Sequence, residues 1–348
     1  KMLENYIARL EVGGNLSTQQ MNDAMNMLLS EGTSDNVKAI FLQHLANKGE
    51  TDDELLAMLT KMEEYGIHIA PKCKGTIIDV CGTGGDKMHT FNISTTASFV
   101  IASCGGIVAK HGNRSSSGIS GSADIFEYFG YDLNADPDTI TSIIEKYNIG
   151  FLFAQKFHPT MKHVSTARKL LQSRTAFNLL GPLCNPARVK NQLIGVFSDE
   201  YLERIANILH RKGAQKIMTV HSKDGLDELS TTSKNTICFL QDGKIDKMII
   251  DPQKFGLHQA TIKDLQVSTK KDAIRAFISV LDGTANQSMI EITALNSAAG
   301  LVVGNLVKDL EEGLQMSLHS IKSGKAFSHF DSFIRNCGDH DKIKEIQQ

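Results

Sequence analysis

The stretch Thr76-Ile77-Ile78-Asp79-Val80-Cys81-Gly82-Thr83-Gly84-Gly85-Asp86 decides the fold of this chain. Its first part, residues 76–81, is a short run rich in β-branched residues that predicts a buried strand ending at glycines. Residues 93–109 are apolar and indicate a buried helix that leads into a second strand at 107–109. A strand, a helix and a second strand in this order predict a βαβ unit with parallel strands.

The same alternation continues towards the carboxyl terminus. Apolar runs at 192–197, 216–221 and 236–240 alternate with helical stretches such as 200–211. This pattern predicts a mostly parallel sheet that is covered on both faces. The expected fold class is therefore α/β, with a large α/β domain.

The first 70 residues are expected to form a separate, all-helical domain. Ser17 with Gln20 and Thr51 with Glu54 are capping boxes that precede apolar residues at helical spacing, and Ser34 can cap a helix between them. Helices with one apolar stripe need a partner, so this bundle must pack on the rest of the chain or on another subunit. Residues 160–188 are again helical and are expected to return to the bundle, which leaves 71–159 and 189–348 for the large domain.

Length and composition exclude several classes of protein. A chain of 348 residues favours two domains, and 41% hydrophobic with 22% charged residues excludes disorder. A net charge of -2 without a long basic run indicates no nucleic-acid partner and no anionic membrane surface. The longest apolar stretch falls short of the roughly 20 residues of a membrane span. No signal-peptide core is apparent, and six scattered cysteines without a Cys-x-x-Cys pair indicate reduced thiols, so we expect a cytoplasmic protein.

The glycines at the end of the first strand are the first candidate site. Gly82, Gly84 and Gly85 allow backbone N–H groups to approach a phosphate without obstruction by a Cβ atom. The spacing matches neither the dinucleotide fingerprint nor the Walker pattern. A purely structural glycine turn is the alternative, but Asp86 would repel a phosphate unless it contacts ribose hydroxyls or a metal ion.

Polar side chains open the helix that follows. Thr90, Asn92, Ser94 and Thr95 offer more hydroxyl and amide groups than one helix cap requires. The surplus indicates a second cradle for phosphate, or a hydroxyl on a metal ion, and structural capping remains the alternative.

The second strand ends in Lys110-His111-Gly112-Asn113-Arg114, and Gly118, Gly121 and Ser122 follow. The carboxyl ends of parallel strands are where α/β sheets bind ligands, and a loop so rich in donors suits a polyanion. His111 taken alone would more often be an ordinary polar residue than a base.

Two further features are open to two interpretations each. Asp227 and Glu228 are adjacent carboxylates that suit Mg²⁺, although a solvated acidic turn has the same composition. Arg168 shares an apolar helical face with Val164 and Leu171, where a charge is costly unless it is paired. It therefore either meets a structural acid at a domain or subunit contact or binds an anionic ligand such as a carboxylate.

Taken together, the strings at 82–86, 90–95, 110–114, 121–124, 174–186 and 224–228 resemble the anthranilate phosphoribosyltransferase family in order and spacing. The resemblance extends from the helical bundle to residue 256, and the last 90 residues are similar mainly in pattern. It implies a small helical domain, a large α/β domain of the nucleoside phosphorylase type, and a homodimer formed through the helical domain. It also implies transfer of a phosphoribosyl group from phosphoribosyl pyrophosphate to anthranilate in tryptophan biosynthesis.

The resemblance also assigns site residues. Those implied to bind phosphoribosyl pyrophosphate are Gly82, Gly84, Gly85, Asp86, Thr90, Asn92, Ser94, Thr95, Lys110 and Ser122. Those implied for anthranilate are Gly82, His111, Asn113, Arg168 and Gly181, and those implied in catalysis are Lys110, His111 and Asn113. Ser94, Asp227 and Glu228 are implied to hold two Mg²⁺ ions. An anthranilate synthase glutaminase component is a possible partner.

Two positions depart from the family pattern: Gly118 stands where Ser is usual, and Gln155 where Pro is common. They concern local loop shape and the position of anthranilate. A related nucleoside phosphorylase, which would use free phosphate and a nucleobase and would not require the acid pair for magnesium, is the alternative enzyme. A non-catalytic homologue would need lesions in these loops, and the sequence has none.

Overall fold

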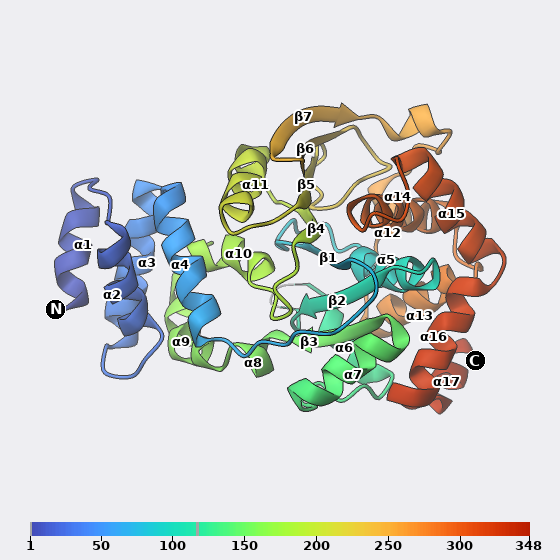
Figure 1. The fold of residues 1–348 in the computed structure, drawn as a ribbon, viewed down its shortest axis with the longest axis horizontal. Coiled ribbons are helices and arrows are strands. Elements are labelled where there is room, and N and C mark those ends of the chain that lie inside the picture. Colours follow the sequence, from blue (N-terminus) through green and yellow to red (C-terminus); the bar gives the residue numbers. More distant parts are fainter. Residues whose placement is uncertain (1, 116–117) are drawn as a thin grey trace. The chain divides into compact units, whose positions relative to one another are not determined.

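The computed structural model describes residues 2–115 and 118–348, and it divides into two compact units (Figure 1). One unit contains Lys1–His68 and Ala154–Pro186, and the other contains Ile69–Phe153 and Ala187–Gln348. The sequence-based bounds of the helical part were 1–70 and 160–188. In the structure, the chain leaves the α/β unit directly after the strand β3 (Ile149–Phe153), so the returning segment begins at Ala154.

The helical unit is built from two segments of the chain. The first segment forms α1 (Leu3–Glu11), α2 (Thr18–Leu28), α3 (Asp35–Lys48) and α4 (Asp52–Tyr65). The second forms α8 (Ala154–Phe157), α9 (Lys162–Leu171) and α10 (Ala176–Leu180), followed by a 3-10 turn at Gly181–Leu183. Helix α9 packs on α3, and α10 packs on α3 and α4.

Buried hydrogen bonds and an ion pair hold these helices together. Both expected capping boxes are present, and Ser34 accepts a bond from the Val37 backbone as predicted. The fully buried Glu54 carboxylate accepts bonds from Thr51 N at 2.8 Å, Leu16 N at 3.1 Å and Lys48 Nζ at 2.6 Å. The buried Lys38 donates to the carbonyls of Ser30 and His163, which joins the first segment to α9. Burial lowers the pKa of Lys38.

The α/β unit contains a seven-stranded sheet in the order β3-β2-β1-β4-β5-β6-β7. Neighbours are parallel from β3 to β5 and antiparallel from β5 to β7. The strands are β1 (Ile77–Gly82), β2 (Ile107–Gly112), β3, β4 (Asn191–Gly195), β5 (Lys216–Ser222), β6 (Asn235–Gln241) and β7 (Lys244–Ile250). The mostly parallel α/β class is thereby confirmed. Every residue of β3 and β4 is buried, so both faces of the sheet are covered there.

The sequence did not predict β3 and β7. Strand β3 runs from a helix directly into another helix, without turn residues to mark its end. Strand β7 lies at the sheet edge, and most of its residues are exposed, so it has no apolar alternation.

Helices from distant parts of the sequence cover the sheet. Helix α5 (Ile93–Ser103) packs on β1 and β2, α11 (Leu202–Arg211) on β5 to β7, and α14 (Gln287–Val303) on β1, β4, β5 and α5. The remaining helices are α6 (Ser122–Tyr128), α7 (Pro137–Tyr147), α12 (Ile262–Leu265), α13 (Lys270–Leu281), α15 (Leu310–Lys322), α16 (Lys325–Cys337) and α17 (Asp341–Gln347). The Phe99 ring of α5 contacts Phe277, Phe330 and Phe333, so the last third of the chain completes this core.

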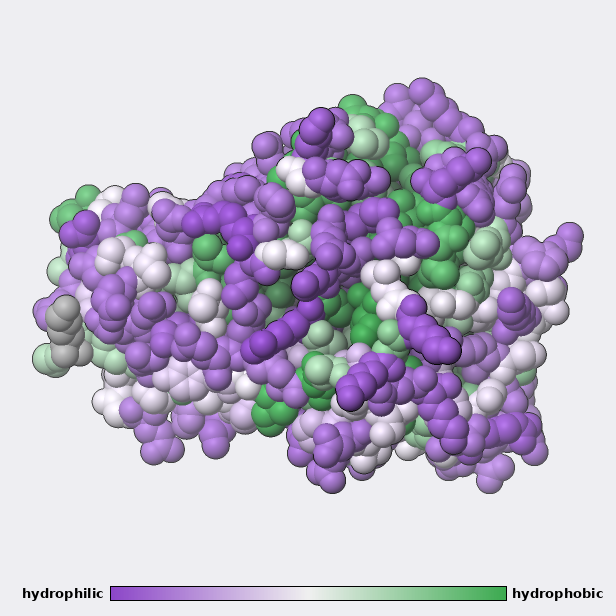
Figure 2. Space-filling model, in the orientation of Figure 1, coloured by the Kyte–Doolittle hydropathy of each residue, from purple (hydrophilic) through white to green (hydrophobic). Residues whose placement is uncertain are grey.

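The surface is predominantly hydrophilic on the face that Figure 2 shows. Among the described residues, the large apolar side chains that are exposed are Met2, Val12, Ile40, Leu170, Met248, Ile249 and Leu306. No helix in the described ranges is both long and apolar enough to cross a membrane. All six cysteines are free thiols.

Candidate functional site

Parallel pairing brings the predicted motifs to one edge of the sheet. Gly82 at the end of β1 pairs with Gly195 at the end of β4, and Gly112 at the end of β2 pairs with Phe153 at the end of β3. The loops that follow β1, β2 and β5 therefore start from the same carboxyl edge, where α/β sheets bind ligands.

Glycines at two strand ends make room for Asp227. A Cβ atom on Gly82 would lie 2.5 Å from Asp227 Oδ2, and a Cβ atom on Gly195 would overlap the Asp227 carbonyl. The Asp227 carboxylate accepts a bond of 2.7 Å from Gly84 N. The sequence predicts that Gly82 lets a phosphate approach the backbone. Its lack of a side chain has a second physical reason, because the acidic loop after β5 passes too close for a Cβ atom.

The loop after β1 is held in a tight conformation. Gly84 and Gly85 have φ values of +74° and +78°, a region that favours glycine. Asp86 folds back, so that Oδ1 accepts from Met88 N at 3.0 Å and Oδ2 accepts from Asp227 N at 3.4 Å. The Asp86 side chain therefore organises this loop and the acidic loop together.

The acidic pair is strongly perturbed. Asp227 is buried, and burial, followed by repulsion from Glu228 and Asp86, raises the pKa of its carboxyl well above the usual range. The pKa of the half-buried Glu228 is raised to about 8, chiefly by burial and then by Asp86, while Lys110 opposes the shift. A solvated acidic turn would not bury Asp227, and carboxyls with raised pKa values are frequent at functional sites.

The Lys110 side chain connects β2 to the start of α5. Its ammonium is buried and donates to the Val80 carbonyl at 2.5 Å and to Ser94 Oγ at 3.1 Å. Lys110 also lies close enough to Glu228 to lower the pKa of that carboxyl. A cation from β2, a hydroxyl from α5 and a carboxylate from the loop after β5 are therefore brought together.

The polar residues before α5 do not act as an ordinary helix cap. Asn92 occupies the N-cap position, but its side chain makes no capping bond. Instead its amide donates to the Ser120 carbonyl at 2.9 Å, while Oδ1 is buried with no partner among the described residues. Thr95 is buried, and Thr90 forms an isolated bridge with Gln266. Structural capping, the alternative left open for these side chains, is therefore not observed at Asn92, and its Oδ1 remains available as an acceptor.

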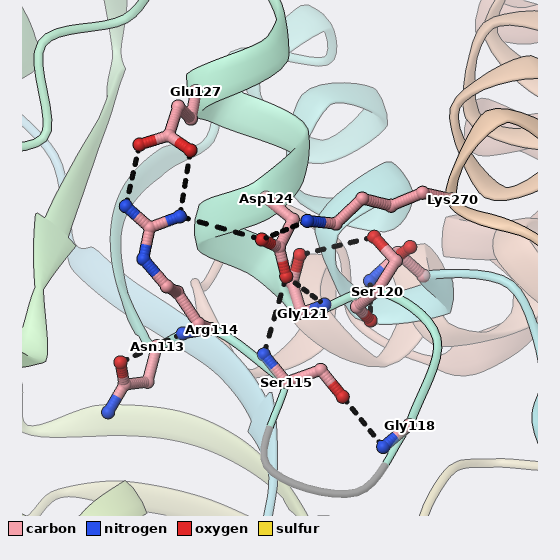
Figure 3. A network of polar contacts seen from close by, with 10 residues as sticks. Asn113, Arg114, Ser115, Gly118, Ser120, Gly121, Asp124, Glu127 and Lys270 are labelled. Atoms are coloured by element: carbon pink, nitrogen blue, oxygen red, sulfur yellow. Dashed lines mark hydrogen bonds and ion pairs between the residues drawn. The ribbon is translucent and has the colours of Figure 1, made fainter.

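The loop after β2 is organised by one carboxylate, as Figure 3 shows. Asp124 Oδ2 accepts from Gly121 N at 2.8 Å and from Ser115 N at 3.3 Å, while Oδ1 lies 3.2 Å from Lys270 Nζ. Burial would raise the pKa of Asp124, but these donors outweigh it and the pKa is lowered. Arg114 pairs through both terminal nitrogens with Glu127, at 2.7 and 2.6 Å. Arg114 is therefore paired with an acid of α6.

The remaining residues predicted in this loop lie as follows. His111 is buried, and its backbone N–H donates to Asp79 Oδ2 at 3.4 Å. The exposed Asn113 accepts a bond from Arg114 N at 2.8 Å. Ser122 begins α6, and its hydroxyl occupies the space that a Cβ atom on Gly112 would need. Gly118, which departs from the family pattern, donates its N–H to Ser115 Oγ at 2.7 Å.

Arg168 and Gly181 belong to the helical unit. The Arg168 guanidinium lies over the Phe177 ring, 5.6 Å from its centroid, and it makes no ion pair with any described residue. Burial is the cause of the lowered pKa of Arg168. The structural-acid alternative therefore finds no support within the described chain. Gly181 starts the 3-10 turn after α10, and the other departing residue, Gln155, lies in α8.

The carboxyls of Asp227 and Glu228 suit a Mg²⁺ ion that is also held by substrate phosphates. Among the described residues, no three His, Cys, Asp or Glu side chains form a metal-binding group. Mg²⁺ is commonly held by one or two carboxylates together with substrate phosphates and water. The perturbed carboxyls of Asp227 and Glu228, next to phosphate-type glycine loops, match that mode rather than a closed protein cage.

Sequence reasoning missed several residues that shape this edge. Asp79 is a fully buried acid inside β1 that accepts from Val80 N and His111 N. Asp124, Gln266 and Lys270 were not singled out either. Asp124 lies within one of the motif strings, so its buried setting was the missing signal, whereas Gln266 and Lys270 lie far away in sequence in a segment without a motif.

Comparison with known proteins identifies the family. Residues 74–327 match the model "Glycosyl transferase family, a/b domain", and residues 4–66 match "Glycosyl transferase family, helical bundle domain". An anthranilate phosphoribosyltransferase of Nitrosopumilus maritimus is 60% identical over 345 residues, which covers 99% of each chain. The chain belongs to the anthranilate phosphoribosyltransferase family.

Solved structures agree with this assignment. The crystal structure of anthranilate phosphoribosyltransferase from Thermus thermophilus is 32% identical, covers 97% of this chain and 99% of its own, and has a TM-score of 0.87. The Saccharomyces cerevisiae enzyme in complex with phosphoribosyl pyrophosphate and Mg is 26% identical, covers 99% and 98%, and has a TM-score of 0.86. The predicted two-part fold is thereby confirmed across the whole chain.

Proposed function

We propose that this chain transfers the phosphoribosyl group of phosphoribosyl pyrophosphate to anthranilate, and that the loops at the carboxyl edge of its sheet bind the phosphoribosyl donor with Mg²⁺. The products are N-(5-phosphoribosyl)anthranilate and pyrophosphate, and the reaction belongs to tryptophan biosynthesis. The observation that carries the site assignment is the acid pair of the buried Asp227, which packs against the glycine loop, and the half-buried Glu228, which lies close to Lys110. Family membership supports the reaction.

The residues around the acid pair supply the donors that a pyrophosphate needs. Backbone N–H groups of the loop at 82–86 and the hydroxyls of Ser94 and Thr95 would contact phosphate oxygens. Asp86, Thr90, Asn92 and Ser122 complete the proposed set, and the available Oδ1 of Asn92 can accept a bond from a ribose hydroxyl. Asp227, Glu228 and Ser94 would hold magnesium, which when bound neutralises charge on the phosphate oxygens. We propose two ions, as the family resemblance implies.

The chemistry follows from where charge develops. Departure of pyrophosphate leaves positive charge on the ribose ring and negative charge on the leaving oxygens. The buried Lys110 ammonium and the backbone donors stabilise the leaving oxygens in a setting with little water. The amine of anthranilate is already nucleophilic, so orientation against the anomeric carbon contributes more than a strong base would. His111, Asn113 and Gly82 are proposed to orient it.

The anthranilate carboxylate needs a cation. We propose Arg168, because its guanidinium is half-buried and no described acid pairs with it. Its planar fork matches a carboxylate in a bidentate arrangement. Gly181 is proposed to line the same path.

We also propose a cytoplasmic homodimer that associates through the helical domain. The free thiols of all six cysteines support a reducing compartment. The exposed Ile40 and Leu170 on the packed pair α3 and α9 support an interface in the helical unit. Association with a glutaminase component of anthranilate synthase remains a proposal that rests on the family resemblance alone.

A fluorescence assay tests the reaction. Anthranilate fluorescence should fall only when phosphoribosyl pyrophosphate and Mg²⁺ are both present, and pyrophosphate should appear in equal amount. Phosphate-dependent cleavage of a nucleoside, without consumption of anthranilate, would instead identify a nucleoside phosphorylase.

A further inference from the structure

A short segment from the last third of the chain contacts the loop between β1 and α5, called the first loop. It also contacts Asp124 of α6, whose carboxylate holds the loop between β2 and α6, called the second loop. Residues 265–270, called the brace below, connect α12 to α13 and lie about 175 positions after the first loop in sequence. The family resemblance gave no motif there, and the proposed function uses none of these residues. The contacts of the brace nevertheless converge on the segment between the glycines at 82–86 and Ser94, and on Asp124 next to Ser122.

The brace pairs with the first loop as a miniature antiparallel ladder. Phe91 N donates to the Leu265 carbonyl at 2.9 Å, and Val267 N donates to the His89 carbonyl at 3.0 Å, around the bridge between Thr90 and Gln266. The Gln266 side chain adds a bond of 3.0 Å from Nε2 to the Met88 carbonyl. The brace thereby fixes the backbone that leads directly into Asn92 and the start of α5.

The first loop needs such support because its backbone is strained. Lys87 and His89 have φ values of +59° and +54°, in the left-handed region that residues with a Cβ atom seldom adopt. Strained positions persist only where surrounding contacts overdetermine them. The bonds at Met88, His89 and Phe91 lie on and around these two positions.

The last residue of the brace contacts the carboxylate of α6 that holds the second loop. Lys270 Nζ lies 3.2 Å from Asp124 Oδ1, and the other oxygen of that carboxylate holds Gly121 N and Ser115 N. Lys270 comes from α13 and approaches Asp124 from the side opposite to Arg114 (Figure 3). Asn92 links the two loops directly by its bond to Ser120. The brace, the first loop and the second loop therefore form one connected unit.

We infer that Gln266 and Lys270 are positioning residues, which set the affinity for the phosphoribosyl donor by holding both loops in their binding conformation. This inference rests on the proposed function for the identity of the donor. Neither side chain needs to touch the substrate, because each acts through the backbone or the carboxylate that it holds. The expected signature is a selective rise in the Michaelis constant for phosphoribosyl pyrophosphate, with little change in turnover at saturation.

Matched substitutions in the full-length protein test the inference. Gln266→Ala and Lys270→Met should each raise the Michaelis constant for phosphoribosyl pyrophosphate by about twofold to tenfold, the range for loss of one exposed hydrogen bond or one exposed ion pair. The constant for anthranilate should stay within about twofold. Lys270→Arg should restore the value, because it keeps the cation beside Asp124.

Two control variants separate positioning from general effects. Lys271→Met removes the same charge from the next residue of α13, which is exposed and has no ion pair among the described residues. Gln253→Ala removes an exposed amide whose Nε2 donates to Gln259, away from both loops. Both controls should behave as the parent protein. An equal rise in Lys271→Met would show a nonspecific charge effect and overturn the role of Lys270.

Hydrogen exchange gives a readout that needs no substrate. Gln266→Ala should accelerate exchange of the amides of Phe91 and Val267 relative to Gln253→Ala, while amides of α14 stay protected. Unchanged exchange together with an unchanged donor constant would overturn the inference. If the parent protein showed no phosphoribosyl transfer, the proposed function would fail, whereas faster exchange would still establish the brace itself.

Discussion

Arg168→Ala should weaken the binding of anthranilate selectively. The guanidinium lies over Phe177, is half-buried, and has no acidic partner among the described residues. We therefore expect an anion from outside the chain to bind it. A bidentate, charge-assisted pair with a carboxylate contributes roughly 1.5 to 3 kcal/mol. The Michaelis constant for anthranilate should therefore rise about 10-fold to 150-fold when binding is near equilibrium.

The structure also limits the expected effect on stability. Removal of Arg168 forfeits a cation–π contact of about 0.5 to 1 kcal/mol but relieves the cost of burying a charge, which lowers its pKa. Because no described ion pair is broken, the melting temperature should change by only a few degrees, at about 2 to 4 °C per kcal/mol. Arg168→Lys should give an intermediate effect, since it keeps the charge and loses the planar fork.

Steady-state kinetics with each substrate varied in turn, together with a melting curve, separates the two roles of Arg168. The constant for phosphoribosyl pyrophosphate should move far less than that for anthranilate. A strongly destabilised Arg168→Ala protein with an unchanged anthranilate constant would refute the carboxylate assignment and indicate a structural partner.

Three other predictions follow from the site and the fold. Turnover should vanish in EDTA and return with excess Mg²⁺, and the double change Asp227→Asn with Glu228→Gln should remove most turnover while the circular dichroism spectrum stays unchanged; full activity in EDTA would contradict the metal assignment. Burial, opposed by a bond to the Cys184 carbonyl, lowers the pKa of His158 from 6.5 to about 4, so between these values the unfolded chain binds a proton that the folded chain does not. Stability should therefore fall as the pH drops through this window, by about 2 kcal/mol from pH 7 to pH 5, and urea unfolding of His158→Gln should lack this component. Light scattering at micromolar concentration should show a dimer, and a monomer would return the apolar helix faces to contacts within the chain.

Local sequence patterns predicted the elements whose signals are local. The capping boxes at Ser17 and Thr51 involve residues only three positions apart, so their bonds can be recognised without a fold. The strand at Ile77–Gly82 was recognisable because it is a short run rich in β-branched residues that ends in glycines, although it contains Asp79. The mostly parallel sheet followed from the regular alternation of such runs with helices.

The candidate site was predicted as a set of motifs, and its interactions were not. Gly82 was recognised as a glycine for phosphate, yet the atom nearest to its absent side chain belongs to Asp227, 145 positions away. The pKa values of Asp227 and Glu228 are raised chiefly by burial, with Glu228 adding to the shift of Asp227 and Asp86 adding to both. No spacing along the chain reveals the burial or the approach of Asp86. The roles of these residues towards substrate and metal remain predictions.

By itself, the sequence determined the α/β class, the helical amino-terminal part, the family and the strings that carry the chemistry, because periodicity, caps and glycine-rich turns are properties of neighbouring residues. Only the tertiary structure decided that Arg168 has no described acidic partner, that Asp124 clamps the second loop, and that residues 265–270 brace both loops. Those facts depend on contacts between segments more than 100 residues apart, such as Phe91 with Leu265, or on which side chains are buried. Hydrogen bonds and burial depend on which groups lie close together in the folded chain. The separation of two residues in the sequence does not give that proximity.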